Sequence, residues 1–312
     1  MRIVVTGAAG QLGRDLVDVL SGRVPVGGVA GAPWGPGAVT DLEVIGTDLA
    51  EVGGSELLAL DLADRGAVGD FFAEIRPGAV IHGAAWTAVD ACEADPDRAF
   101  AVNAMATRHV VEAAGRGGAH VVYISTDYVF DGTSPRPYVE WDQPSPVSAY
   151  GRSKLAGELE VAPGHSVVRT SWVCGAHGAN MVKTALRLAG GDGPLRFVDD
   201  QHGSPTFTAD LAGALARLAI ERRPGRFHLT NAGATTWFGF VRAVLSAAGA
   251  DPARVQAITT AQLVPPRPAP RPANSVLDNA AWRLSGLPPL PHWQDALRRL
   301  VAVLASTPQE GG

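Results

Sequence analysis

The sequence predicts an α/β protein with a doubly wound, parallel, Rossmann-like sheet and a smaller, mostly C-terminal substrate domain. Short β-branched segments alternate with amphipathic helical segments over the first half of the 312 residues, as in parallel sheets with helical crossovers. A Gly-rich turn follows the first of these segments. We expect a dinucleotide-binding domain at residues 1–174 and 204–235, and a substrate domain at residues 175–203 and 236–312.

The first strand is expected at residues 3–6, before the turn TGAAGQLG and a helix. Gly7, Gly10 and Gly13 allow the backbone N–H groups and the positive helix end to approach a pyrophosphate, because a Cβ atom would hold them off. The spacing G-x-x-G-x-x-G differs from the G-x-G-x-x-G fingerprint and resembles that of short-chain dehydrogenases. A glycine turn without a ligand is the alternative interpretation.

Two further strands are expected at residues 43–46, ending near Asp48, and at residues 57–60, ending at Asp61. An acid at the end of the second strand usually accepts hydrogen bonds from the adenosine ribose, whereas a 2′-phosphate requires an arginine. Asp48 therefore favours NADH. Residues 21–41 are rich in Gly and Pro, and we predict that they form an inserted loop.

The fourth and fifth strands are expected at residues 79–82 and 120–124, with a long helix at residues 97–115 between them. Asn103 in this helix is interpreted as a polar surface residue. The sequence STDY, residues 125–128, follows the fifth strand, at the edge where ligands bind in an open α/β sheet.

The pattern becomes less regular after a strand expected at residues 167–173. The later expected elements are a helix at 180–188, a polar loop at 198–207, a helix at 209–220, a strand at 226–229 and a helix at 293–304. The proline-rich segment 264–275 is interpreted as an extended surface loop, with a polyproline ligand for another protein as the alternative.

Composition indicates an ordinary globular protein that acts on small molecules. Apolar residues make up 46%, charged residues 18%, and the net charge is −5, so we expect no nucleic-acid partner and no membrane partner. Cys92 and Cys174 are far apart and belong to no metal-binding motif, which favours a reducing compartment without a metal site. The chain starts without a signal-peptide pattern, so we expect a cytoplasmic protein.

Tyr150 and Lys154 lie four residues apart in YGRSK, which places them one turn apart on the same face of a helix. Lys154 and Lys183 are the only lysines among 26 basic residues, which suggests that Lys154 supplies a compact ammonium rather than a planar guanidinium. A solvated lysine beside a packing tyrosine is the alternative.

Together with the fifth-strand hydroxyls, this pair fits the reduction of a ketone by hydride. Negative charge that develops on the ketone oxygen requires a proton donor and a second hydrogen-bond donor, and Tyr150 and Thr126 fit these roles. We expect Lys154 to lower the pKa of Tyr150, which is ordinarily about 10, and to bind the nicotinamide ribose.

Six motifs occur in the order seen in dTDP-4-dehydrorhamnose reductases, which are extended short-chain dehydrogenases. They are TGAAGQLG, AAWTAVD, STDYVFDG, YGRSKLAGE, RTSWV and DDQHGSPT. The chain is therefore identified as a member of this family, and the resemblance covers residues 1 to about 305. It implies reduction of the C4 ketone of a dTDP-4-keto-6-deoxyhexose, most often dTDP-4-dehydro-L-rhamnose, with NADPH or possibly NADH.

The resemblance also implies roles for individual residues. Thr126, Tyr150 and Lys154 match the catalytic residues. The matching cofactor positions are Gly10, Gln11, Leu12, Asp61, Ala85, Trp86 and Thr87. The whole predicted cofactor site adds Gly7, Gly13, Asp48, Leu62, Tyr150 and Lys154. The matching substrate positions are Thr126, Asp127, Trp172, Lys183, Arg271 and Asn274. For Lys183, a solvated helix face is the alternative.

Several departures from the family pattern bear on substrate and assembly. Tyr128 stands where the related dehydratases have a glutamate, so the base for elimination is missing. Trp86 and Cys174 replace common family residues, and we expect them to affect the choice of sugar. Gln294 replaces an acid that helps some members to hold Mg²⁺ at a dimer interface, although Asp15 and Asp210 match the other two acids; we expect that site to be weak or absent, and the protein to be a monomer or a homodimer.

Two alternatives to the rhamnose precursor enzyme stay open. One is a related reductase for an antibiotic deoxysugar, such as a dihydrostreptose-type synthase. The other is a non-catalytic regulatory subunit of the same fold, like the β subunit of methionine adenosyltransferase, against which the intact catalytic residues argue.

Overall fold

Seven parallel strands form the central sheet of the computed structural model, which describes residues 1–37, 41–49 and 57–306. The strands are β1 (Arg2–Thr6), β2 (Glu43–Asp48), β3 (Leu58–Ala59), β4 (Ala79–His82), β5 (His120–Thr126), β6 (Ser166–Thr170) and β11 (Gly225–His228). Their order is β11-β6-β5-β4-β1-β2-β3, and every neighbouring pair is parallel. This is the order of a doubly wound Rossmann sheet with one added strand, so the predicted fold class is confirmed.

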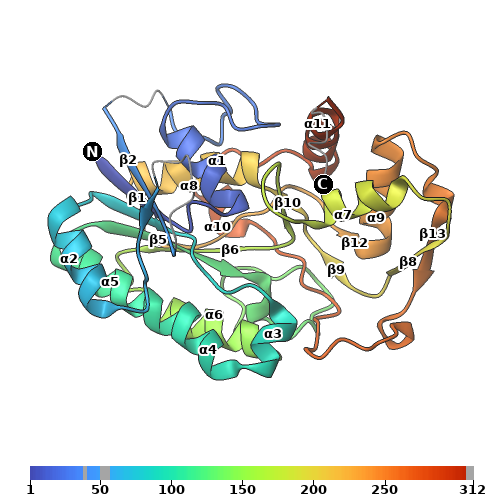
Figure 1. Cartoon of the computed structure of the whole chain (residues 1–312), viewed down its shortest axis with the longest axis horizontal. Helices are drawn as coiled ribbons and strands as arrows, with labels where there is room; N and C mark the ends of the chain where they lie inside the picture. The colour runs from blue at the N-terminus through green and yellow to red at the C-terminus, as the bar shows by residue number, and fades with distance from the viewer. Residues whose placement is uncertain (38–40, 50–56, 307–312) are drawn as a thin grey trace.

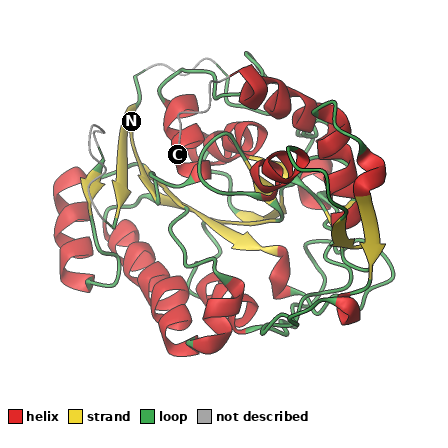
Figure 2. Cartoon of the chain, turned by 45° about the vertical axis from the view of Figure 1, so that its right-hand side comes forward, coloured by secondary structure: helices red, strands yellow, loops and turns green. Residues whose placement is uncertain are grey.

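Helices cover both faces of the sheet (Figures 1 and 2). One face carries α1 (Gln11–Leu20), α8 (Thr208–Ile220) and α10 (Ala280–Leu284), and the other carries α2 (Arg65–Ile75), α3 (Val89–Ala94), α4 (Pro96–Phe100), α5 (Ala106–Arg116) and α6 (Ala149–Leu159). Because strand side chains alternate between faces, Val5 packs in the core of α8 with Leu215, whereas Val4 packs in the core of α5 with Val110. Both faces are thus buried, which explains the continuous apolar runs of these strands.

A second hydrophobic core lies beside the sheet, at the right of Figure 1. Its elements are α7 (Met181–Ala189), α9 (Trp237–Ala247), α11 (Trp293–Ser306) and the parallel pair β8 (Leu195–Val198) and β13 (Val255–Ile258). The 3-10 turns Pro252–Arg254 and Thr260–Gln262 lie on either side of β13 in the chain. Phe240, Val244 and Leu297 are among its fully buried residues. The division of the chain into two domains stays a prediction. None of the described helices combines the length and apolar composition that a bilayer span requires.

The expected helix at residues 97–115 is interrupted by a π-helical turn, Ala101–Met105, between α4 and α5. The interpretation of Asn103 as a surface residue is wrong, because this turn directs it inward and leaves only 1% of it exposed. Such π-turns often occur at functional sites, and the helical periodicity of the sequence does not reveal them.

The expected strand at residues 167–173 ends early, at Thr170. The backbone turns at Trp172, which has a φ of +45°, and β7 (Val173–Cys174) then pairs with β10 (Thr206–Phe207) outside the main sheet. The expectation of a polar loop at 198–207 is also wrong in part, because this segment contains two short strands. One is β10, and the other is β9 (His202–Gly203), which pairs with β12 (Thr235–Thr236). These two-residue strands form by pairing with distant segments. They are too short to show an alternating pattern in the sequence, so the sequence does not predict them.

The predicted loop at residues 21–41 has no helix or strand in its described parts, residues 21–37 and 41. Trp34 is buried against Gly213 of α8, and Arg217 donates a hydrogen bond to the carbonyl of Pro33 at 3.1 Å. The loop is therefore packed onto the sheet's helical layer. Residues 38–40 of the predicted loop lie outside the described residues.

We predict that Gly157→Ala lowers the free energy of unfolding by about 1–3 kcal/mol, the usual cost of overpacking. A Cβ at Gly157 would come closer than 3.0 Å to the Tyr123 hydroxyl and the Asn103 carbonyl oxygen, and would push α6 away from the sheet. Urea unfolding measures the change. Gly164→Ala is the matched control, because a Cβ there meets nothing within 4 Å; equal stability of the two variants would contradict the close approach of α6.

Candidate active site

A cavity of about 900 Å³ lies at the carboxyl ends of the strands. It reaches from the ends of β2 and β3, past β1 and β4, to the ends of β5 and β6, and it includes the face of α6 and Trp237 of α9. The order of the strands reverses between β1 and β4, and open α/β sheets bind their ligands at this point. A cavity of this size can hold a small-molecule cofactor or substrate.

Most of the residues predicted for the site line this cavity. They are Gly7, Gly10, Gln11, Leu12, Asp48, Asp61, Leu62, Ala85, Trp86, Thr87, Thr126, Asp127, Tyr150, Lys154 and Trp172. Gly13 does not line it, and instead allows α1 to approach the turn, because a Cβ there would overlap the Gly7 carbonyl oxygen.

The Gly-rich turn forms a cradle that side chains would fill. Gly7 has a φ of +72°, and a Cβ would lie 2.8 Å from the Ala84 nitrogen. Gly10 precedes α1, and no side chain caps the first N–H groups of this helix. These N–H groups and the positive helix end fit the pyrophosphate of a dinucleotide.

Asp48 lies at the end of β2, where its carboxylate is fixed by two backbone N–H groups. Oδ2 accepts a hydrogen bond from Ala9 N at 2.9 Å and Oδ1 accepts one from Leu49 N at 2.8 Å. Asp61 adds a second carboxyl group to this end of the cavity, and among the described residues that line the cavity only Arg98 and Lys154 are basic. This end can therefore accept hydrogen bonds from ribose hydroxyls. Arg14 does not line the cavity, but its Nε donates a hydrogen bond to the Ala9 carbonyl oxygen at 3.1 Å.

Tyr150 and Lys154 lie on the same face of α6, which begins where the Ser148 side chain accepts a hydrogen bond from Gly151 N at 3.1 Å. Tyr150 is 8% exposed and Lys154 is 3% exposed, so the alternative of a solvated helix face is wrong. The Lys154 ammonium lies 4.2 Å from the centre of the Tyr123 ring, where a cation–π interaction favours its charge.

Burial controls the pKa of both side chains. It lowers the pKa of Lys154 to about 7, against the opposing effect of Glu158. Burial also raises the pKa of Tyr150 above its ordinary value, against a hydrogen bond with Thr126. Burial therefore dominates the pKa of Tyr150, and the phenol is protonated at neutral pH. The expected effect of Lys154 on this pKa stays a prediction.

Thr126 is the last residue of β5 and Asp127 follows it. The Thr126 hydroxyl donates a hydrogen bond to Asp127 Oδ1 at 3.0 Å and accepts one from Tyr128 N at 3.2 Å. Asp127 is 2% exposed, its Oδ2 has no partner among the described residues, and burial raises its pKa to about 6. A buried carboxyl group with a free oxygen at a cavity wall fits a hydroxyl group of a ligand.

Asn103 is a site residue that the sequence interpretation missed. Its Oδ1 accepts a hydrogen bond from Trp86 N at 2.8 Å, and its Nδ2 donates to the Trp86 carbonyl at 3.1 Å and to Ser153 Oγ at 3.0 Å. It thus ties the segment after β4 to the helix of Tyr150. An amide within the otherwise apolar run 99–106 was the only signal in the sequence.

A buried ion pair lies behind the site, between Glu158 of α6 and Arg169 of β6. Glu158 accepts hydrogen bonds from Arg169 Nε at 2.8 Å and Nη2 at 2.7 Å, and from Ser125 Oγ at 2.6 Å. Both charged side chains are fully buried. Two features of the sequence could have predicted this pair: a glutamate one helical turn after Lys154, and an arginine within an apolar strand.

Three predicted substrate residues lie outside the set that lines the cavity. Arg271 forms a two-pronged ion pair with Asp90, at 2.6 and 2.9 Å. Asn274 donates hydrogen bonds to the carbonyl oxygens of Ser134 and Arg136, and Lys183 lies on α7 with its side chain partly exposed.

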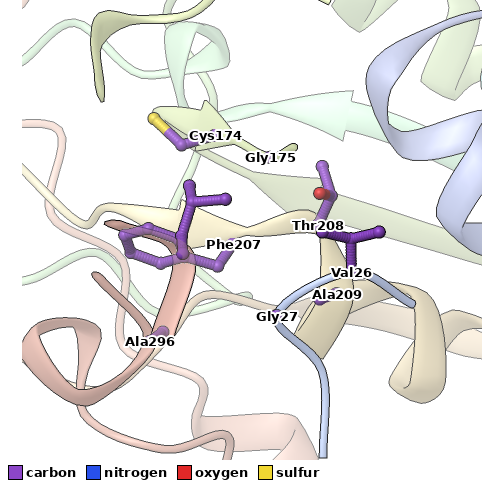
Figure 3. A pocket seen from close by; sticks show the side chains of 9 residues that line it. Val26, Gly27, Cys174, Gly175, Phe207, Thr208, Ala209 and Ala296 are labelled. Atoms are coloured by element: carbon purple, nitrogen blue, oxygen red, sulfur yellow. The ribbon is translucent and has the colours of Figure 1, made fainter. Parts of the chain in front are cut away.

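Cys174 does not reach the large cavity either. It lines a separate small cavity of about 10 Å³, with Phe207, Thr208 and Val26 among its neighbours (Figure 3). A volume of this size holds at most one water molecule. The expectation that Cys174 affects the choice of sugar has no support in this position.

The residues considered for Mg²⁺ lie in two different environments. Asp15 belongs to a group with Asp18 and His177 whose possible ligand atoms all lie within 4.8 Å of one another. The carboxylate of Asp210 accepts hydrogen bonds from Arg299 at 2.7 and 2.9 Å and from Asn231 at 2.8 Å, so its charge is neutralised by a guanidinium. Asp15 is fully buried, and burial raises its pKa to about 6. The expected weakness or absence of a Mg²⁺ site stays a prediction.

Comparisons with known proteins agree with this geometry. The family described as "RmlD substrate binding domain" matches residues 1–306. A dTDP-4-dehydrorhamnose reductase of Streptomyces griseus is 42% identical, over 95% of this chain and 91% of the relative.

Two solved structures share the fold. A dTDP-4-dehydrorhamnose reductase from Clostridium acetobutylicum has a TM-score of 0.86 at 38% identity, with 98% of this chain and 100% of that chain covered. One from Bacillus anthracis, in complex with NADP, has a TM-score of 0.83 at 34% identity, with 96% and 98% covered.

Replacement of Asp127 by asparagine is expected to stabilise the protein at pH 8 by up to about 3 kcal/mol. The pKa rise from 3.8 to about 6 reflects the cost of keeping this buried carboxylate ionised. That cost is absent below pH 4, grows as the pH rises towards 6 and is complete above it. Urea unfolding of both proteins at pH 8 and pH 4.5 should show a stability difference that shrinks at the lower pH. A variant that is less stable than the wild type at pH 8 would show that Asp127 is not a strained group.

Proposed function

We propose, from the premise that the chain belongs to the RmlD family of dTDP-4-dehydrorhamnose reductases, that it reduces the C4 ketone of a dTDP-4-keto-6-deoxyhexose with a nicotinamide cofactor. The leading substrate is dTDP-4-dehydro-L-rhamnose. One observation carries this proposal: the buried Tyr150 and Lys154 face the same cavity as Thr126, the Gly-rich turn and the acids at the adenosine end.

Tyr150 is the proton donor in this proposal. A bound nicotinamide would supply the hydride for C4. The phenol of Tyr150 gives its proton to the C4 oxygen, and the Thr126 hydroxyl turns from Asp127 to donate the second hydrogen bond to that oxygen. The raised pKa of Tyr150 suits this direction of reaction, because a proton donor must be protonated at neutral pH before the step.

Lys154 stabilises the tyrosinate that remains after proton transfer. Its pKa of about 7 means that its charge responds to small changes in the site, and a neighbouring negative charge favours the ammonium form. Glu158, one turn further along α6, acts in the same direction. We propose that the same ammonium also binds the nicotinamide ribose.

Asp127 and Trp172 are proposed to contact the sugar, and Arg271, Asn274 and Lys183 the nucleotide diphosphate end. Support for Arg271 comes from Tyr128, which lines the cavity: burial raises the pKa of its phenol to about 12, and the nearby Arg271 guanidinium opposes this rise. An anionic ligand would therefore need to replace Asp90 as the partner of this guanidinium.

Tyr150→Phe should lower kcat with a dTDP-4-keto-6-deoxyhexose by about 10²- to 10⁴-fold, the usual contribution of a positioned proton donor. The ring that packs in the site is kept and only the proton is lost, so the Kd for the nicotinamide should stay unchanged. Oxidation of the reduced cofactor, followed by absorbance, measures the rate. Undiminished turnover by this variant would refute the proton-donor role, and a wild type without reductase activity would favour the regulatory subunit.

We also propose that NADH is preferred over NADPH, although the family resemblance put NADPH first. A 2′-phosphate would lie near the fixed carboxylate of Asp48, with no described lysine or arginine lining that end of the cavity. We expect kcat/KM to be at least about tenfold higher with NADH, which corresponds to about 1.4 kcal/mol of repulsion. Asp48→Asn keeps the size of the side chain but removes its charge, so it should reduce the ratio of kcat/KM with NADH to kcat/KM with NADPH. A preference of the wild type for NADPH would contradict this assignment.

A further inference from the structure

Trp172 has a backbone conformation that a tryptophan adopts only when its surroundings impose it. Its φ of +45° lies in the left-handed region, which is unfavourable for any residue with a Cβ atom. The Trp172 carbonyl oxygen accepts a hydrogen bond from Thr206 N at 3.2 Å. Gly203 lies against the indole, where a Cβ would come closer than 3.0 Å to Trp172 Cε2. The strained turn thus aims a large aromatic ring along one defined direction.

Trp237 completes the surroundings of this ring. The two indoles are stacked, with ring centres 3.6 Å apart and an angle of 7° between their planes. Trp237 is the first residue of α9, and the edge of Phe240 contacts both rings at 6.1 and 6.3 Å. The start of α9 is fixed in turn, because Thr236 Oγ1 accepts a hydrogen bond from Gly239 N at 3.0 Å and donates one to Asp199 at 2.6 Å.

The stacked pair lies at the end of the cavity where the ketone would be reduced. Both indoles line the cavity. Thr170 of β6 pairs directly with Thr126 of β5, and Trp172 follows Thr170 by two residues, so Trp172 lies close to Thr126. The adenosine end lies further along the same edge of the sheet, because β4 and β1 separate β5 from β2. A flat apolar wall at this place can pack against the C–H face and the methyl group of a 6-deoxypyranose.

We infer that Trp237 is a positioning residue that holds the Trp172 indole as the wall of the sugar subsite. This inference rests on the proposed function, and it adds a residue for which the sequence gave no role. Trp237 acts through Trp172, so its loss should weaken sugar binding. The nicotinamide cofactor should keep its affinity, because its adenosine end is expected across the cavity, at the ends of β1 and β2.

The test measures binding of dTDP-L-rhamnose by calorimetry, so that it does not depend on turnover. Trp237→Ala should raise its Kd about two- to tenfold, the factor that corresponds to the loss of an aromatic pair of about 0.5–1.5 kcal/mol. Trp237→Phe should restore most of the affinity, because a phenyl ring can still stack. Gly203→Ala, which displaces the Trp172 ring, should weaken binding with Trp237 in place. Trp141→Phe is the matched control, since Trp141 is 68% exposed.

A second readout reports the stack itself. Two indoles stacked at this separation couple their electronic transitions. The tryptophan bands in circular dichroism should therefore change in Trp237→Phe and Trp172→Phe beyond the loss of one chromophore seen in Trp141→Phe. Wild-type affinity in Trp237→Ala, or an equal loss of sugar and nicotinamide binding in the Ala and Phe variants, would overturn the positioning role. The two proposals can fail separately. If the wild type binds dTDP-L-rhamnose but reduces no ketosugar, and Trp237→Ala weakens that binding, the proposed function is overturned and this inference is upheld.

Discussion

The buried ion pair between Glu158 and Arg169 is the interaction on which the site depends. It joins α6, which carries Tyr150 and Lys154, to β6, and the bond from Ser125 joins the same carboxylate to β5. Removal of one partner of such a pair typically costs about 3–5 kcal/mol, because the other charge stays buried and unpaired. The pair therefore fixes the relative positions of the residues proposed to donate the proton and to share the oxygen.

The residues proposed for catalysis and sugar binding are held in conditions that disfavour their charged forms. Burial lowers the pKa of Lys154 to about 7 and raises the pKa of Asp127 to about 6, and it keeps the Tyr150 phenol protonated. Such a site reduces the stability of the fold, and proteins commonly accept this cost where function needs it. The surrounding core, with Tyr123 and Asn103 packed against α6, supplies the compensating contacts.

The sequence allowed the sheet, the Gly-rich turn and the Tyr150–Lys154 pair to be predicted, because each depends on local spacing. The features that it did not reveal depend on contacts between distant segments. Asn103 faces inward because of a π-helical turn, and Trp172 meets a partner 65 positions later in the chain, at Trp237. Family resemblance suggested Arg271 and Asn274 as substrate residues, but it could not show that Arg271 pairs with Asp90.

The central claim is that this site transfers hydride from a nicotinamide to C4 of a dTDP-linked ketosugar. Incubation of the purified protein with NADH that carries deuterium at the transferable position, and with a dTDP-4-keto-6-deoxyhexose, tests it directly by NMR of the product. The account predicts deuterium at C4 of the sugar, in a single configuration. A product without deuterium at C4, or with deuterium at another carbon, would contradict it.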